Sequence, residues 1–187
     1  MDKEIVWLDF NILKAFMIDT FKKMGLDDND AEIASDVLIS ANKVGMDSHG
    51  IDRLKTYYYD KLKSGIINKE TNIEIINNQL TTAVIDGHGG IGLVIGRKSM
   101  QLAIEKAKEY GLGMVAVRNS NHYGFAGYYA QMAIDNEMIG ITGTNTPPYV
   151  APTFGIENLL GTNPLTFGLP TDEDFPFIID CATTVTA

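Results

Sequence analysis

The chain has 187 residues, with 24 acidic against 15 basic residues and a formal net charge of -9. A hydrophobic share of 45% and a charged share of 21% are typical of a globular protein with a core of one or two domains. The acidic balance argues against nucleic acid as a partner, because binding to a phosphate backbone draws on Lys and Arg.

The sequence also lacks the signals of disulfide-bonded, secreted and membrane proteins. Cys181 is the only cysteine, which rules out an intrachain disulfide and a CxxC metal site. Met1 to Glu4 lack the basic and apolar pattern that begins a signal peptide. No segment approaches the roughly 18 apolar residues of a membrane span. We therefore expect a cytoplasmic protein without a membrane segment.

The first third of the sequence predicts helices. Apolar residues recur at helical spacing over 13–21, until Gly25 ends the pattern. Residues 27–30 supply candidate caps for a second helix, whose apolar face covers 33–41. A third helix is expected over 54–62. Together these segments predict a small N-terminal helical region.

The remainder alternates between strand and helix patterns, which predicts an α/β domain. Strands are expected over 81–85, 114–117, 138–142 and 177–180, and helices over 99–110 and from the small residues after 124 to about 136. A segment rich in Pro and Gly, 146–170, is expected to be mostly loop and short strand. We predict a helical region at 1–70 and a domain at 71–187 that binds cofactor and substrate.

A glycine pattern follows the first predicted strand. Gly87, Gly89 and Gly92 form a GxGxxG, which in a Rossmann domain cradles a pyrophosphate at a helix N-terminus. The second strand ends in Arg118 and Asn119, where that fold needs an acidic residue for the ribose. The helical pattern also begins only several residues after the glycines. A simple turn is favoured, and a Rossmann site with an arginine for a 2′-phosphate remains the alternative.

The three histidines, His49, His88 and His122, have no HxxxH spacing and no cysteine partner, so we expect no metal. His49 and Arg53 are four residues apart and would share one helical face, which Tyr57 continues. An imidazole and a guanidinium on one face could grip a carboxylate.

The alternative for this segment is purely structural. Asp47 would cap a helix, and Arg53 would pair with Asp52 or another surface acid.

His122 follows a predicted strand end, in a loop of Asn, Ser and Gly. An α/β fold places reactive groups there, because the strand fixes their position and the loop exposes them. Histidine titrates near neutrality and can supply the proton that accompanies hydride transfer to a carbonyl. The alternative is a histidine that only hydrogen-bonds its loop.

Four segments together resemble one family, the type-2 malate/L-lactate dehydrogenases, which include ureidoglycolate, sulfolactate and diketogulonate-type enzymes and some cyclic-imine reductases. The matching segments are Ser48-His49-Gly50-x-x-Arg53-Leu54, Asn119-Ser120-Asn121-His122-Tyr123-Gly124, Gly161-Thr162-Asn163-Pro164 and Asp180-Cys181-Ala182-Thr183. They occur in the family's order, and the resemblance covers essentially the whole chain.

The resemblance implies roles for the residues that match. His122 corresponds to the proton donor and acceptor, and His49 and Arg53 to the residues that grip the substrate's carboxylate. Thr146 falls where a hydroxyl residue contacts the cofactor. The strand end Asp180, Cys181 and Ala182 matches the part that lies against the nicotinamide.

The resemblance further implies a non-Rossmann α/β domain of the malate/lactate dehydrogenase type-2 fold after the helical region, NAD or NADP as cofactor, no metal, and a homodimer. The chain would be the N-terminal portion of a longer protein, and its second domain would be incomplete. The expected function is interconversion of a small 2-oxo acid and its 2-hydroxy acid. The alternatives are the Rossmann-type NADP oxidoreductase and a non-catalytic binding or assembly module.

Overall fold

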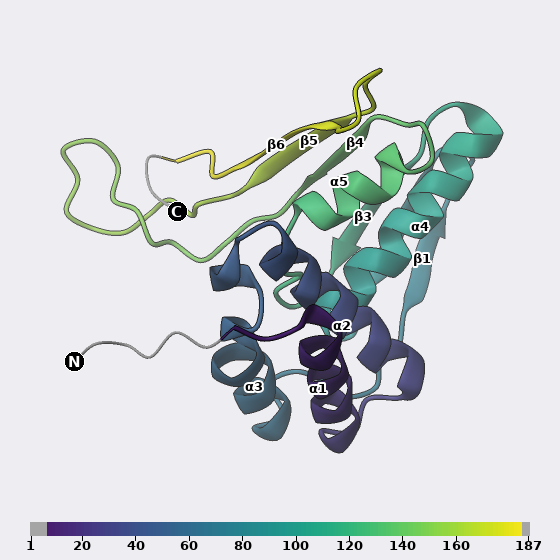
Figure 1. The fold of residues 1–187 in the computed structure, drawn as a ribbon. Coiled ribbons are helices and arrows are strands. Elements are labelled where there is room, and N and C mark those ends of the chain that lie inside the picture. The colour runs from purple at the N-terminus through teal and green to yellow at the C-terminus, as the bar shows by residue number, and fades with distance from the viewer. Residues whose placement is uncertain (1–6, 185–187) are drawn as a thin grey trace. The chain divides into compact units, whose positions relative to one another are not determined.

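The computed structural model describes residues 7–184, and Figure 1 shows how their helices and strands follow one another. The chain forms two compact units, which divide in the sequence between Phe125 and Ala126. The boundary expected near residue 70 separates helices from strands inside the first unit. No helix within 7–184 combines the length and apolar composition that a membrane crossing requires. Met1 to Glu4, on which the signal-peptide prediction rests, lie outside the described residues.

The first unit opens with two packed helices, α1 (Phe10–Lys23) and α2 (Asp28–Lys43), as predicted. The carboxylate of Asp9 accepts from the first amides of α1, and that of Asp27 accepts from the amide of Asp30 at 2.7 Å in α2. Each cap satisfies amides that have no partner inside the helix. The buried faces of the two helices begin the core, with Met17, Phe21, Val37 and Leu38 fully enclosed.

The third predicted helix has an unexpected form. A 3₁₀ turn, η1 (Asp47–His49), precedes a π-helical segment, η2 (Leu54–Tyr59), and a short α3 (Asp60–Lys63) follows. Leu54, Tyr58 and Leu62 are buried at intervals of four and hold this segment to the core. The sequence predicted a helix here but not its π-helical winding. Single π-helical turns are rare and often occur at functional sites.

The first sheet contains β1 (Glu74–Asn78), β2 (Thr82–Asp86) and β3 (Met114–Arg118). β1 pairs antiparallel with β2, and β2 pairs parallel with β3 through the crossover helix α4 (Gly92–Tyr110). The sequence did not predict β1, because all five of its residues are exposed and show no alternation.

The helix α4 corrects the prediction that this helix begins near residue 99. It begins at Gly92. The sequence pattern did not show this start, because Leu93, Val94 and Ile95 are all fully buried and the first turn therefore has no amphipathic pattern. A Cβ on Gly92 would overlap the carbonyl oxygens of Asn121 and His122. The N-terminus of α4 therefore packs directly on the loop that carries His122.

The second unit is an antiparallel sheet with one helix against it, α5 (Gly127–Ile134) (Figure 1). The strands are β4 (Gly140–Gly143), β5 (Leu165–Leu169) and β6 (Phe177–Cys181), in the order β4-β5-β6. A Cβ on Gly140 would lie 2.8 Å from the carbonyl oxygen of Ala130, so glycine there permits the close approach of α5. The strand β5 lies in the Pro- and Gly-rich segment, which was expected to contain short strand.

Candidate active site

His122 lies in the loop after β3, and two groups of the first unit fix its ring. The Tyr58 hydroxyl is 2.7 Å from Nδ1 of His122, and the Gly124 amide donates to the same nitrogen at 3.2 Å. A backbone amide only donates, so Nδ1 is an acceptor and the neutral ring carries its proton on Nε2. Nε2 is therefore the nitrogen through which this ring can exchange a proton with a substrate.

Four half-buried side chains, spaced four residues apart in the sequence, lie near His122. This row consists of His49, Arg53, Tyr57 and Lys61. The rings of His49 and His122 stack with centroids 5.9 Å apart, and the Tyr57 ring is 4.9 Å from that of His122. Lys61 places its ammonium 3.6 Å from the centre of the Tyr57 ring. The row gathers three basic side chains beside one imidazole in a protein of net charge -9.

This surrounding has a clear electrostatic effect. Burial, followed by the positive charges of His49, Arg53 and Lys61, lowers the pKa of His122 to about 4. At neutral pH the ring is therefore neutral, and it gains a proton readily only if an anion offsets the nearby positive charge. An anionic substrate would supply that negative charge.

The environment of Arg53 argues against the purely structural interpretation of its segment. Its Nε donates to the backbone oxygen of Ser48 at 2.7 Å, and no carboxylate of residues 7–184 forms an ion pair with it. The carboxylate of Asp47 instead accepts from the side-chain amide of Asn42 at 2.6 Å. Neither the helix cap on Asp47 nor the pairing with Asp52 is found. The remaining N–H groups of Arg53 are suited to an external anion.

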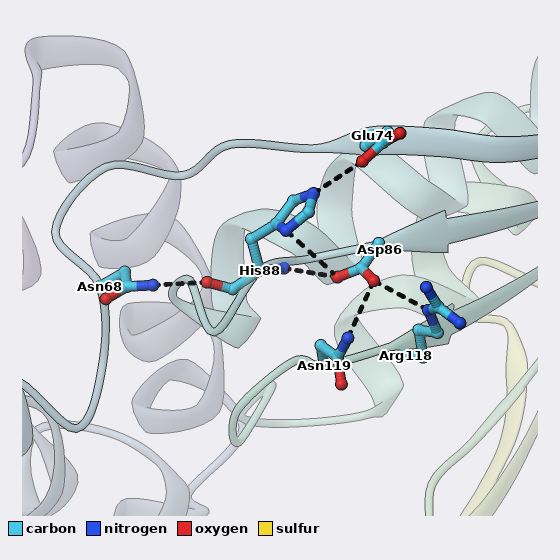
Figure 2. A network of polar contacts seen from close by, with 6 residues as sticks. All are labelled: Asn68, Glu74, Asp86, His88, Arg118 and Asn119. Carbon is cyan, nitrogen blue, oxygen red and sulfur yellow. Dashed lines mark hydrogen bonds and ion pairs between the residues drawn. The ribbon is translucent and has the colours of Figure 1, made fainter.

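The loop that carries His122 is braced by the buried carboxylate of Asp86, which ends β2 (Figure 2). One carboxylate oxygen accepts from the amide of His88 at 2.9 Å. The other accepts from Arg118 Nε and from the side-chain amide of Asn119, each at 2.8 Å. These donors, the His88 amide foremost, hold the pKa of Asp86 below its usual value, although burial opposes them.

Further contacts extend this brace to the neighbouring segments. His88 Nε2 lies 3.0 Å from a carboxylate oxygen of Glu74 in β1, and Asn68 donates to the His88 backbone oxygen (Figure 2). His88 and Asn119 both adopt positive φ, 46° and 52°, so the brace supports two unusual backbone turns. The end of β2, the end of β3 and the start of the His122 loop are thereby held together.

The backbone groups of the glycine turn before α4 form hydrogen bonds with other residues of the chain. The amides of Gly87 and Gly89 donate to the backbone oxygens of Arg118 and Asn119, at 3.0 and 2.7 Å. The side chain of Asn121 donates to the oxygens of Gly89 and Gly90, at 2.9 and 3.0 Å. The early start of α4 removes one objection to a Rossmann site. The internal use of the amides and the close approach of the loop to Gly92 argue against a pyrophosphate there.

In the second unit, the segments expected to hold the cofactor meet near the end of β6. The Thr146 hydroxyl lies 3.2 Å from that of Thr162, and the Thr146 amide donates to Asn163 Oδ1 at 3.0 Å. The Thr183 amide donates to the backbone oxygen of Thr162, and the Thr183 hydroxyl donates to the backbone oxygen of Asn163, each at 3.0 Å. Cys181 is exposed and Ala182 is half-buried.

Asp180 has a structural task in the same unit. One carboxylate oxygen accepts from the amide of Gly127, the first residue of α5, at 2.8 Å, and the other accepts from the Thr166 hydroxyl at 2.8 Å. The carboxylate thus caps α5, whose preceding residue, Ala126, has no side-chain cap. Its place at the end of β6 is therefore explained without a cofactor contact, and its cofactor role stays a prediction.

The structure thus brings His49, Arg53 and His122 together in the first unit, and Thr146 together with the Thr162 and Thr183 segments in the second. The sequence interpretation missed Lys61 and Tyr58. The interval of four from His49 through Arg53 and Tyr57 could have identified Lys61. The interval of four from Leu54 to Leu62 marks Tyr58 as a buried residue, but nothing in the sequence points to its contact with His122. Within 7–184, no three His, Cys, Asp or Glu side chains are arranged to hold a metal ion.

Comparison with known proteins places this chain in a family. The profile of the family described as malate/L-lactate dehydrogenase matches residues 8–187. The chain belongs to the malate/L-lactate dehydrogenase family. The resemblance carried by the four sequence segments is thereby confirmed.

Individual relatives agree with this assignment. The chain is 48% identical over 185 residues to a malate dehydrogenase of Pyrococcus abyssi, covering 99% of this chain and 51% of the relative. It is 47% identical over 170 residues to an L-sulfolactate dehydrogenase of Methanocaldococcus jannaschii, covering 91% and 49%. The crystal structure of malate dehydrogenase from Entamoeba histolytica superposes with a TM-score of 0.95 at 48% identity, covering 98% and 51%.

These comparisons also confirm the predicted fold class, an α/β structure of the malate/lactate dehydrogenase type. The chain spans about half the length of these relatives.

The brace on Asp86 gives a prediction about stability. The Asp86→Asn substitution should lower the urea midpoint of unfolding near pH 7, because the charged acceptor of three hydrogen bonds is lost. A carboxylate whose folded pKa is lowered stabilises the protein above its unfolded pKa, about 3.9, and this contribution disappears as the pH falls through the folded value. The difference between wild type and variant should therefore shrink below about pH 4.

Urea titrations at a series of pH values would measure this difference, with the exposed Asp172→Asn as the matched control. A difference that is constant with pH, or equal to that of the control, would contradict the role of the Asp86 charge.

Proposed function

We propose that the protein carrying this chain is an NAD(P)-dependent oxidoreductase that interconverts a small 2-oxo acid and its 2-hydroxy acid, with His122 as the acid/base. The carrying observation is the neutral His122 ring among three basic side chains, His49, Arg53 and Lys61. Such a site attracts an anion and gives an imidazole the role of exchanging the proton. The names of the relatives, malate and L-sulfolactate dehydrogenases, support the same class of reaction.

We assign Arg53 and His49 to the substrate's carboxylate. Arg53 offers a planar fork of N–H donors, and among residues 7–184 its Nε is the donor with a hydrogen-bond partner, the backbone oxygen of Ser48. His49 lies against the ring of His122, so a carboxylate held by both residues would lie beside the acid/base. The substrate's negative charge would then raise the pKa of His122 from its low ligand-free value.

We assign the cofactor to the second unit, to Thr146 and the strand end Asp180, Cys181 and Ala182. The residues fit a flat nicotinamide ring, because the strand end exposes small side chains and the Thr146 hydroxyl adds a polar contact. The bound cofactor would accept the hydride from the 2-hydroxy acid or return it to the 2-oxo acid. NAD and NADP are both compatible with this assignment.

Three further parts of the proposal concern the intact protein. Its substrates are small acids such as malate or sulfolactate, the compounds named in its relatives, whose second anionic group would also suit Lys61. We further propose that it acts as a homodimer and in the cytoplasm.

The role of His122 predicts the effect of its removal. In the intact protein, His122→Ala should lower kcat by about a hundredfold or more, because the proton donor and acceptor is lost. Cofactor affinity, measured by the fluorescence of NADH or NADPH, should remain nearly unchanged. His88→Asn is the matched control, since it replaces a histidine of the brace with a residue that tolerates the same positive φ. Turnover unaffected by His122→Ala would refute the assignment of the acid/base to His122, whereas absence of turnover in the intact wild type would favour a non-catalytic module.

The role of Arg53 predicts a different kinetic signature. Arg53→Lys keeps the charge but loses the planar fork, so KM for the acid substrate should rise by about tenfold or more with a smaller change in kcat. Initial rates over a range of 2-oxo acid concentrations would separate the two parameters. Arg97→Lys, on the surface beside Asp36, is the matched control. Equal KM values for the two variants would assign Arg53 to a structural role only.

A further inference from the structure

Tyr58 is the residue behind the acid/base that the proposed function does not use. Its side chain is fully buried in the π-helical segment η2, at 0% exposure. Its hydroxyl lies 2.7 Å from Nδ1 of His122 and 3.4 Å from the backbone oxygen of the same residue. One hydroxyl therefore faces both an imidazole nitrogen and a carbonyl oxygen of His122.

The two protonation states of His122 make different demands on this hydroxyl. In the neutral state with the proton on Nε2, Nδ1 accepts from both Tyr58 and the Gly124 amide. In the protonated state Nδ1 carries a hydrogen, and the Gly124 amide cannot accept it, because it has no lone pair to offer. The Tyr58 oxygen can accept it, provided that its own hydrogen turns to another acceptor. The backbone oxygen of His122 is in place for that hydrogen.

We propose that Tyr58 is a positioning residue for the acid/base step, and that its hydroxyl reverses its hydrogen bond with His122 Nδ1 when the ring passes from its resting form, protonated on Nε2 alone, to its working form, protonated on Nδ1. The hydroxyl donates to Nδ1 in the resting state. In the working state it accepts from Nδ1 and donates to the His122 backbone oxygen. This inference rests on the proposed role of His122 as acid/base.

The proton balance of the reaction follows directly. In reduction, the Nε2–H bond of protonated His122 breaks, and the proton joins the substrate oxygen whose carbon receives the hydride. His122 is left neutral with its proton on Nδ1, held by Tyr58. This tautomer has its lone pair on Nε2, which is the form that takes a proton from a 2-hydroxy acid in the reverse direction. Both directions therefore use the arrangement in which Nδ1 donates to Tyr58.

Tyr58 acts by rotating its hydroxyl, not by ionising. Burial, with a smaller contribution from Tyr57, raises the pKa of Tyr58 well above its usual range, so the hydroxyl keeps its hydrogen. The groups that face His122 from the other elements are His49, Arg53 and Lys61, which all oppose a charged ring. The Tyr58 oxygen, 2.7 Å from Nδ1, is placed to accept a hydrogen bond from the protonated nitrogen.

The test replaces Tyr58 by Phe in the intact protein, which keeps the buried ring and removes only the hydroxyl. Because the charged ring loses its acceptor, kcat should fall about tenfold to a hundredfold in both directions, with little change in the KM of the acid substrate. In the reduction direction, the high-pH limb of the kcat profile should move to lower pH, because His122 gives up its proton more readily. Phe21→Leu is the matched control, since the Phe21 ring packs edge-on against Tyr58 at 6.2 Å and does not supply a hydroxyl. It should lower stability and leave the pH profile in place.

Nitrogen NMR of ¹⁵N-histidine-labelled protein provides a readout independent of turnover. In the wild type, Nδ1 of His122 should show the shift of an unprotonated nitrogen in the resting state. Saturating oxamate, an unreactive mimic of a 2-oxo acid, should move it toward the protonated shift, and Tyr58→Phe should reduce that change at the same pH. A wild-type Nδ1 that is already protonated in the resting state would overturn the proposal, even if the variant does not fold.

The outcomes separate this inference from the proposed function. If His122→Ala retains full turnover, the acid/base assignment fails and the inference fails with it. If His122→Ala is inactive while Tyr58→Phe keeps the wild-type pH profile and nitrogen shifts, only the role of Tyr58 is refuted.

Discussion

The site depends on one constraint, which is that a neutral imidazole is held among positive charges inside the first unit. Burial and the three basic neighbours of His122 all disfavour its protonated form, and the Gly124 amide, which donates to Nδ1, does so as well. The ligand-free ring is consequently neutral at pH 7. An anion that neutralises the neighbours would reverse this preference, so substrate charge and ring protonation become coupled.

The fold maintains this constraint through backbone contacts on both sides of the His122 loop. Gly92 allows the N-terminus of α4 to pack on the carbonyl oxygens of the loop, while the carboxylate of Asp86 holds Asn119 at its start. The π-helical segment places the Tyr57 ring 4.9 Å from the His122 ring, tilted by 48°, and the Tyr58 hydroxyl 2.7 Å from its Nδ1. The glycine turn that resembles a phosphate loop braces the His122 loop, because the amides of Gly87 and Gly89 donate to the backbone oxygens of Arg118 and Asn119.

Sequence patterns predicted the elements that bury one face, such as α1, α2 and β2, whereas the grouping of His49, Arg53 and His122 was implied by the family resemblance. The patterns failed where they did not show burial. The strand β1 is exposed throughout, and the first turn of α4 is buried all round, so neither has a readable period. The place of Tyr58 depends on π-helical winding, and the helix cap supplied by Asp180 depends on contacts between distant segments. Local spacing contains neither kind of information.

Calorimetry of oxamate binding to the intact protein tests the coupling between substrate charge and the protonation of His122 most directly. Titrations at pH 6.5 in buffers of different ionisation enthalpy would count the protons taken up on binding. We expect net proton uptake in the wild type and a clearly smaller uptake in His122→Gln, because the ring of His122 gains the proton when the anion arrives. Binding without proton uptake, or equal uptake in both proteins, would contradict this coupling.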